Sequence, residues 1–471
     1  MGETGDDNGN PLDAERALRL ASGLTELVEA ARSRVREQRS SDLVDRVTAH
    51  VGCELGEMPN VSSSFGGWEH ANVQRGFDAL LAQRSPRAEW FGISAGVGVS
   101  GHDLRNLLSM AEHHGMVRLG AVDYRTVAIG PDEVTEAVQL GFVASRAPDG
   151  SPVVFGLRGP QDHSTSCLVQ VFAASRAVAT AARDDLEANI RARDVHRGAV
   201  LQFDIGDHYG NELVTFLHRP RLDAADVVLP GGALEAIERH VVRSAGHNAR
   251  LVELGQHLKR GLLLHGPPGT GKTHTVRYLL SRLKGVTAAV LSGRALTSLL
   301  PAATALVRRL QPAVLIIEDV DLIAEDRAVS HGATPLLFEL LNRIDGIDPD
   351  ADVTFVLTTN RVDALEQALV DRPGRVDLAV EVPRPDAAAR ERLLRLYAGP
   401  TRLDVADPAE LIAATEGVTA SFVREWVRRT IVTQLSEGVA EPVLDESRLR
   451  ATLEELTRQG HRLTGRLLGG T

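Results

Sequence analysis

The amino-acid sequence predicts an α/β protein, built on a doubly wound parallel sheet that carries a phosphate-binding loop. A C-terminal helical lid subdomain is expected to follow this sheet, and an α+β domain to precede it. The first observation is the stretch 266–273, which matches the phosphate-binding pattern G-x-x-x-x-G-K-[ST]. The second is its setting, because an apolar segment, 261–265, precedes it and a helical segment, 273–283, follows it. The third is the alternation of apolar and helical segments beyond it, which is typical of parallel strands joined by crossover helices.

The elements before the loop indicate a separate N-terminal domain. Residues 1–11 are polar and acidic, and we expect a disordered start without a secretory signal. Helical spacing predicts helices at 12–49, 72–81, 104–114 and 173–193. Strand patterns are present at 152–157, 168–172 and 199–203. The segment 59–67 has the composition of a loop. The Pro-, Asp- and Gly-rich stretch 219–232 is expected to be the main linker, and the helix 234–244 to open the next domain. We therefore expect a helical and α+β recognition domain over 12–225.

The elements after the loop indicate the sheet and then the lid. Apolar segments at 287–291, 313–317 and 353–357 predict strands, and 297–310 and 335–343 predict the helices between them. These elements define a large α/β subdomain over 226–385. Beyond it we expect strands to stop and the helices 387–397, 408–415, 420–436 and 446–459 to form a small subdomain over 386–471.

Bulk composition excludes several classes of protein. With 471 residues the chain is long enough for roughly three domains. No apolar run approaches the ~18 to 20 residues that span a bilayer, so we expect no membrane segment. Only Cys53 and Cys167 are present, which indicates a reducing compartment, and we expect the cytoplasm. The net charge of −11 argues against broad nucleic-acid binding.

The glycine-rich loop predicts a nucleotide site. Its glycines let backbone N–H groups turn inward at a helix N-terminus, where the helix dipole also favours phosphate. Lys272 supplies a cation for the β and γ phosphates, and Thr273 a hydroxyl for Mg²⁺. The candidate nucleotide-binding residues are Gly266, Pro267, Pro268, Gly269, Thr270, Gly271, Lys272 and Thr273. The chain contains only three lysines, and one of them stands where the motif requires it, which supports the motif.

Polar residues at two strand ends are the candidate catalytic groups. The apolar run 313–317 ends in Glu318 and Asp319, where carboxylates would meet Mg²⁺ and the attacking water. Alternatively these acids form a solvated strand end or a helix cap. The next buried strand ends in Asn360, which would hold the attacking water or be an ordinary turn residue. Arg372 and Arg375 are either surface arginines or donors presented to a neighbouring subunit's γ phosphate.

Taken together, residues 226–434 resemble the AAA family of ATPases. The string 260–273, the acidic strand end, Thr359–Asn360 and the stretch 371–377 carry the resemblance. It implies a P-loop (Walker A) at 266–273, a Walker B segment at 315–319, Asn360 as sensor 1 and Arg372 and Arg375 as arginine fingers. ATP and Mg²⁺ are the implied cofactors, with Thr273 and Glu318 on the metal and Asp319 on the water. The family usually has Asp then Glu here. With the reversed order we still expect hydrolysis, at a rate that the shorter side chain of Asp319 could lower.

The resemblance also implies an assembly and a class of substrate. Members of the family form hexameric rings with ATP between subunits, so the arginines would act in trans, and 415–420 would lie near the adenine. We expect a homo-hexamer that remodels protein substrates selected by the N-terminal domain. The alternative is a nucleotide-dependent switch or scaffold, because Leu300 stands where protein-threading members carry an aromatic pore residue. Leu299 and Leu300 either grip polypeptide weakly or pack in the core. A nucleic-acid motor is the least favoured hypothesis.

Overall fold

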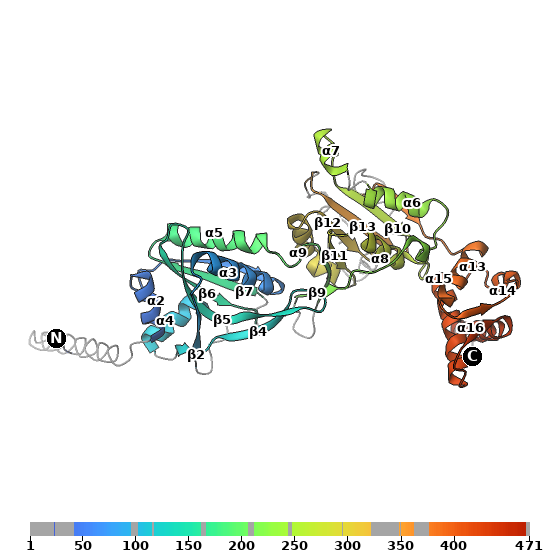
Figure 1. The fold of residues 1–471 in the computed structure, drawn as a ribbon, viewed down its shortest axis with the longest axis horizontal. Helices are drawn as coiled ribbons and strands as arrows, with labels where there is room; N and C mark the ends of the chain where they lie inside the picture. The colour runs from blue at the N-terminus through green and yellow to red at the C-terminus, as the bar shows by residue number, and fades with distance from the viewer. Residues whose placement is uncertain are drawn as a thin grey trace, which may run out of the picture. The chain divides into compact units, whose positions relative to one another are not determined.

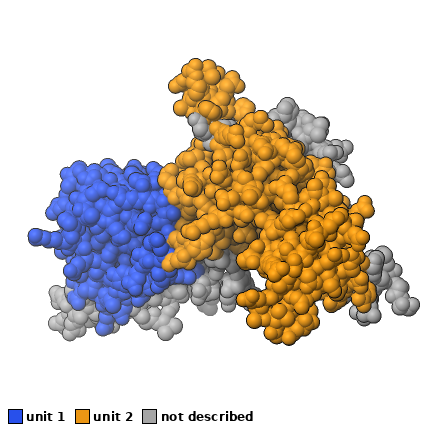
Figure 2. All heavy atoms as spheres, turned by 45° about the vertical axis from the view of Figure 1, so that its right-hand side comes forward, with its two compact units in different colours: residues 1–129, 133–195 blue, residues 130–132, 196–471 orange. Residues whose placement is uncertain are grey.

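The computed structural model of the protein describes residues 42–95, 102–114, 117–161, 166–205, 212–243, 247–293, 295–321, 348, 350–361 and 376–467, and position 23. The chain divides into two compact units, one of residues 1–129 with 133–195 and one of residues 130–132 with 196–471 (Figure 2). The expected disordered start, nearly all of the segment 12–41 and the helix 335–343 lie outside the described residues. Each described helix is too short or too polar to cross a bilayer.

The first unit contains an antiparallel sheet with helices on both faces (Figure 1). Its strands run in the order β1-β7-β6-β5-β2-β3, and β4 pairs with β5. The strands are β1 (Asn60–Gly66), β2 (Trp90–Ala95), β3 (Val117–Gly120), β4 (Asp123–Ala128), β5 (Val134–Arg146), β6 (Pro152–Arg158) and β7 (Ser166–Ala173). The helices are α2 (Asp42–Val51), α3 (His70–Arg84), α4 (Leu104–His114) and α5 (Arg176–Ala192).

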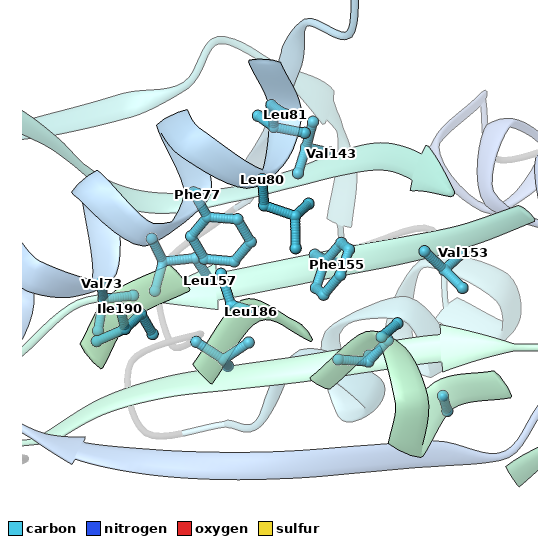
Figure 3. Close-up of a cluster of buried hydrophobic side chains, with 14 of the residues drawn as sticks. Val73, Phe77, Leu80, Leu81, Val143, Val153, Phe155, Leu157, Leu186 and Ile190 are labelled. Carbon is cyan, nitrogen blue, oxygen red and sulfur yellow. The ribbon is translucent and has the colours of Figure 1, made fainter. Parts of the chain in front are cut away.

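Each face of this sheet has its own hydrophobic core. On β6, Val153 and Phe155 point to the core under α3 and α5, whereas Val154 points to the core under α2 and α4. Figure 3 shows Phe77 of α3 facing Phe155, and their ring centroids are 5.5 Å apart. Because both faces are covered, the central strands are apolar at successive positions rather than at every second one.

The loop expected over 59–67 is a strand instead. β1 pairs antiparallel with β7 over its whole length, with Val61 opposite Val171 and Phe65 opposite Cys167. Val61 and Phe65 both pack against the core under α3 and α5. Serines between them lower the apolar content, so the period-two pattern is carried by two residues only and the segment has the composition of a loop.

The second unit contains a mainly parallel sheet in the order β14-β10-β13-β12-β11-β8-β9 (Figure 1). Among the described strands of this sheet, only the edge strand β9 runs antiparallel to its neighbour. The strands are β8 (Val200–Ile205), β9 (Glu212–Leu217), β10 (Arg260–His265), β11 (Thr287–Leu291), β12 (Ala313–Ile317), β13 (Val353–Thr359) and β14 (Leu378–Glu381). The helices are α6 (Ala233–Ile237), α7 (Asn248–Glu253), α8 (Lys272–Arg282) and α9 (Ala295–Arg309). The carboxyl ends of β10, β12 and β13 therefore meet at one edge.

The boundary between the units differs from the expected one near residue 225. The strand expected at 199–203 is β8, and it pairs parallel with β11 of the second sheet rather than with the N-terminal sheet. After β9, Arg219 donates hydrogen bonds to the carbonyls of Leu280, Leu283 and Val286, at 2.8 Å each, and to that of Gly198 at 3.0 Å. The turn-rich stretch that begins at 219 is therefore fastened to the end of α8, and the division lies at residues 195–196.

Among the described residues after β14, four helices and a two-stranded sheet are present. The helices α13 (Ala387–Ala398), α14 (Ala409–Ala414), α15 (Ala420–Ser436) and α16 (Glu446–Leu467) enclose a core around Trp426, whose Nε1 donates to the Leu449 carbonyl at 2.8 Å. The expectation that strands stop here is wrong, because β15 (Arg402–Asp404) pairs parallel with β16 (Val443–Asp445). Strands of three residues are too short to produce a periodic pattern in the sequence.

Candidate functional site

The glycine-rich loop connects the buried strand β10 to the first turn of α8. Gly266 has φ 145°, and a Cβ added there would lie 2.2 Å from the Val382 carbonyl oxygen, so only glycine fits without movement of the backbone. Gly269 and Gly271 also have positive φ angles, 77° and 117°. Gly271 is the N-cap of α8. The backbone thus takes the left-handed turns that a phosphate-binding loop needs at a helix N-terminus.

Lys272 is buried at the start of α8 and bonds to three oxygens. Its Nζ donates to the carbonyl oxygens of Gly266 at 2.8 Å and Pro267 at 2.9 Å, and to Asn360 Oδ1 at 2.8 Å. Burial lowers the pKa of Lys272, while the nearby carboxylates of Asp319 and Asp321 act in the opposite direction. The lysine of the loop and the amide at the end of β13 therefore belong to one site.

Glu318, which follows β12, has the features of a metal ligand. Burial raises its pKa, a hydrogen bond from the Thr273 side chain acts against this, and the charge of Asp319 adds to it. Its Oε1 atom is buried and has no hydrogen-bond partner among the described residues. A hard cation such as Mg²⁺ prefers oxygen ligands and would satisfy this atom, so Thr273 and Glu318 fit the metal that the sequence predicts.

Asp319 occupies a left-handed turn directly after β12. Its φ is 51°, the only positive φ among described residues other than glycine. Its backbone N–H donates to Thr358 Oγ1 at 3.0 Å, which ties the turn to β13. Its Oδ1 accepts a hydrogen bond from Asn360 Nδ2 at 3.2 Å. The side chain lines the same cavity as Lys272 and Asn360.

Asp321 is a member of the site that the sequence did not reveal. It is 7 % exposed, and its Oδ1 accepts hydrogen bonds from Thr359 Oγ1 and from the backbone N–H of Asn360, both at 3.0 Å. Its Oδ2 lies 3.5 Å from Asn360 Nδ2. The only signal in the sequence was that this residue belongs to the same acidic run as Glu318 and Asp319.

A cavity of about 820 Å³ lies beside these residues, in the range of small-molecule sites. The loop, Asp319 and Asn360 form part of its wall. Arg221 and Asp226 line it from before α6, and Tyr397 and Arg424 from the helical subdomain. None of these last four was predicted as a site residue, because they come from segments without a recognisable motif.

The helical subdomain contacts the loop directly. The backbone N–H of Ser421 donates to the Gly269 carbonyl at 3.0 Å. Thr419 accepts from the Phe422 N–H at 3.3 Å and so caps α15, while Thr415 Oγ1 accepts from Arg390 Nε at 3.1 Å. The segment 415–420 therefore leads into the helix that closes one side of the cavity.

Two further sets of predicted residues are the arginine pair and the leucine pair. Arg372 and Arg375 lie outside the described residues. Leu299 and Leu300 are each 2 % exposed on α9, a helix that packs against β8, β11 and β12. Of the two possibilities open for these leucines, the structure has core packing.

Comparison with known proteins gives one matching family. Residues 262–384 match the model of the ATPase family associated with various cellular activities (AAA). The chain is 33 % identical over 192 residues to 26S protease regulatory subunit 6A of Caenorhabditis elegans, covering 38 % of this chain and 44 % of that protein. It is 32 % identical over 188 residues to proteasome-activating nucleotidase 2 of Halobacterium salinarum, covering 37 % and 44 %. It is also 32 % identical over 229 residues to ATP-dependent zinc metalloprotease FtsH 3 of Sorangium cellulosum, covering 45 % and 38 %. The chain thus spans less than half the length of these relatives.

Proposed function

We propose that this chain, whose residues 262–384 are a domain of the AAA family, binds ATP in the 820 Å³ cavity and hydrolyses it. The observation that carries this proposal is the convergence of Lys272, Asn360 and Asp319. Two hydrogen bonds, of 2.8 and 3.2 Å, join them in a row beside the phosphate-binding loop. A cation, a neutral amide and a carboxylate in this order are suited to hold a phosphate, position water and accept its proton.

Each residue has a role in the proposed reaction. The loop N–H groups and Lys272 hold the phosphates, and Asn360 contacts the γ phosphate and the attacking water. Thr273 and Glu318 would hold Mg²⁺, which when bound offsets the negative charge on the phosphate oxygens. Asp319 orients the water and takes its proton. Arg372 and Arg375 complete the site from a neighbouring subunit, so hydrolysis depends on assembly.

The substrate is proposed from the relatives. Two of them are named as a protease regulatory subunit and a proteasome-activating nucleotidase, and both names link the relative to protein degradation. By analogy, we place this chain in the cytoplasm as a homo-hexameric ring that remodels protein substrates or complexes. The unit formed by residues 1–129 and 133–195 is then the part that selects the protein.

One observation favours a second candidate, a nucleotide-dependent switch or scaffold. Leu299 and Leu300 are buried in the core of the large subdomain, so they present no apolar surface with which to grip a polypeptide. A switch would order a partner site in its ATP state without threading a chain. An unfolded protein that stimulates ATP turnover supports the remodeller; partner binding that responds to ATP without such stimulation supports the switch.

Nucleotide binding by full-length protein tests the proposal first. Lys272→Ala should weaken ATP binding in isothermal titration calorimetry by at least about 100-fold, since it removes a buried charge that bonds phosphate. The matched control is Lys284→Ala, because Lys284 is exposed and does not line this cavity. Equal affinity of the two variants for ATP would remove the assignment.

A further inference from the structure

Asp321 is buried at the site, yet it is not among the described residues that line the cavity. Three contacts of its carboxylate reach the end of β13. Oδ1 accepts from Thr359 Oγ1 and Asn360 N–H at 3.0 Å, and Oδ2 faces Asn360 Nδ2 at 3.5 Å. Thr359 Oγ1 in turn accepts from the Arg361 N–H at 3.0 Å. The carboxylate of Asp321 therefore fixes the backbone and the side chain of Asn360 at the end of β13.

These contacts fix which way the Asn360 amide points. Its Nδ2 lies between the carboxylates of Asp319 and Asp321, at 3.2 and 3.5 Å, and its Oδ1 lies 2.8 Å from Lys272 Nζ. Rotating the amide by half a turn would place Oδ1 against two carboxylates and Nδ2 against the ammonium group. Both new contacts would be repulsive, so the charges on either side select one orientation.

We propose that Asp321 is a positioning residue, which accepts one Nδ2–H of Asn360 and so aims the other at the place where Asp319 and the attacking water meet. This role rests on the ATPase function proposed above and adds a residue to it. Asp319 contacts the other side of the amide but also faces the cavity, where the attacking water competes with Asn360 for its carboxylate. Asp321 is shielded from the cavity, so its contact with the amide persists when the ligands change.

A purely structural role for Asp321 is separable from this one. Two of its three contacts anchor the backbone turn through Oδ1, and only Oδ2 contacts the amide. Asp321→Asn keeps an oxygen for both anchors and replaces Oδ2 by an NH₂ group, which cannot accept from Asn360 Nδ2. Thr359→Val is the matched control, because it removes one anchor of the turn and leaves the amide contact in place.

The experiment compares the affinity of the full chain, with Mg²⁺, for ADP and for ADP with aluminium fluoride, a mimic of the transition state. In Asp321→Asn the gain in affinity from aluminium fluoride should fall about 10- to 100-fold, because a hydrogen bond to a charged group contributes about that factor. The affinity for ADP alone should stay within about twofold of wild type. In Thr359→Val the gain should be retained, even if the melting temperature falls. A full gain in Asp321→Asn, or equal losses in the two variants, would overturn the proposal.

A double-mutant cycle tests whether Asp321 acts through Asn360. Asn360→Ala alone should lose the gain from aluminium fluoride, and adding Asp321→Asn should cost nothing further. Additive losses would show that Asp321 acts by another route. If Asn360→Ala keeps the full gain, neither Asn360 nor Asp321 has the role proposed for it. If wild-type protein binds ADP but gains nothing from aluminium fluoride, the proposed hydrolysis itself is contradicted.

Discussion

Lys272 and Asn360 are 88 positions apart in the chain, yet the lysine Nζ donates to the asparagine Oδ1 at 2.8 Å. The contact exists because β10, which leads into the loop, and β13, which Asn360 follows directly, are parallel neighbours in the sheet. Their carboxyl ends therefore lie at the same edge, as in other sheets of this type.

The loop should tolerate no side chain at Gly266. Gly266→Ala would bring a Cβ to 2.2 Å from the Val382 carbonyl oxygen at a φ of 145°, so the loop must shift. We expect ATP affinity to fall at least about tenfold and the protein to lose about 1–3 kcal/mol of stability. Calorimetric titration and urea unfolding measure the two effects. Gly231→Ala is the control, because its Cβ would meet nothing within 4 Å; equal effects at the two glycines would contradict the geometry.

The buried carboxyl of Glu318 should make stability depend on pH. Burial raises its pKa above the ordinary 4.5, so the folded state holds a proton that the unfolded state has lost. Above the ordinary pKa, the free energy of unfolding therefore falls as pH rises towards the raised pKa. At pH values above the raised pKa, this loss of stability has reached its full size. Glu318→Gln removes this cost. In the absence of Mg²⁺ and nucleotide, its melting temperature should exceed that of wild type at pH 8 and match it near pH 4, and the reverse order would refute the shift.

Subunit mixing tests whether the arginines act in trans. Lys272→Ala subunits retain both arginines, and Arg372→Ala/Arg375→Ala subunits retain the lysine. Each variant alone should have lost most of its ATP turnover, whereas a mixture recovers part of it at interfaces that combine an intact loop with intact arginines. Phosphate release across mixing ratios measures the recovery. A strictly additive mixture would mean that the arginines serve their own subunit's nucleotide.

Leu300 should behave as a core residue. Because it is 2 % exposed, Leu300→Ala is expected to cost about 2–5 kcal/mol of unfolding free energy. Urea denaturation gives this number. Unchanged stability, together with loss of ATPase stimulation by an unfolded protein, would place Leu300 in a substrate channel and restore the threading mechanism.

Much of the second unit was predictable from the sequence, since strands such as β11 and β12 consist almost wholly of apolar residues and are bounded by clear breaks. The loop motif and the polar ends of β12 and β13 also marked one edge of the sheet. β8 was recognised as a strand, but the sheet that it joins depends on pairing with β11, about 90 residues away, which local patterns do not encode. Asp321 was missed because its role comes from contacts with β13.

Steady-state phosphate release by full-length wild type and Asp319→Asn, with ATP and Mg²⁺, tests the ATPase site most directly. Wild type should show Mg²⁺-dependent turnover. Asp319→Asn should bind ATP as tightly and release phosphate at least about 100-fold more slowly, because the amide cannot take a proton from water. Equal rates in the two proteins, or no turnover in assembled wild type, would contradict catalysis at the edge where Lys272, Asn360 and Asp319 meet.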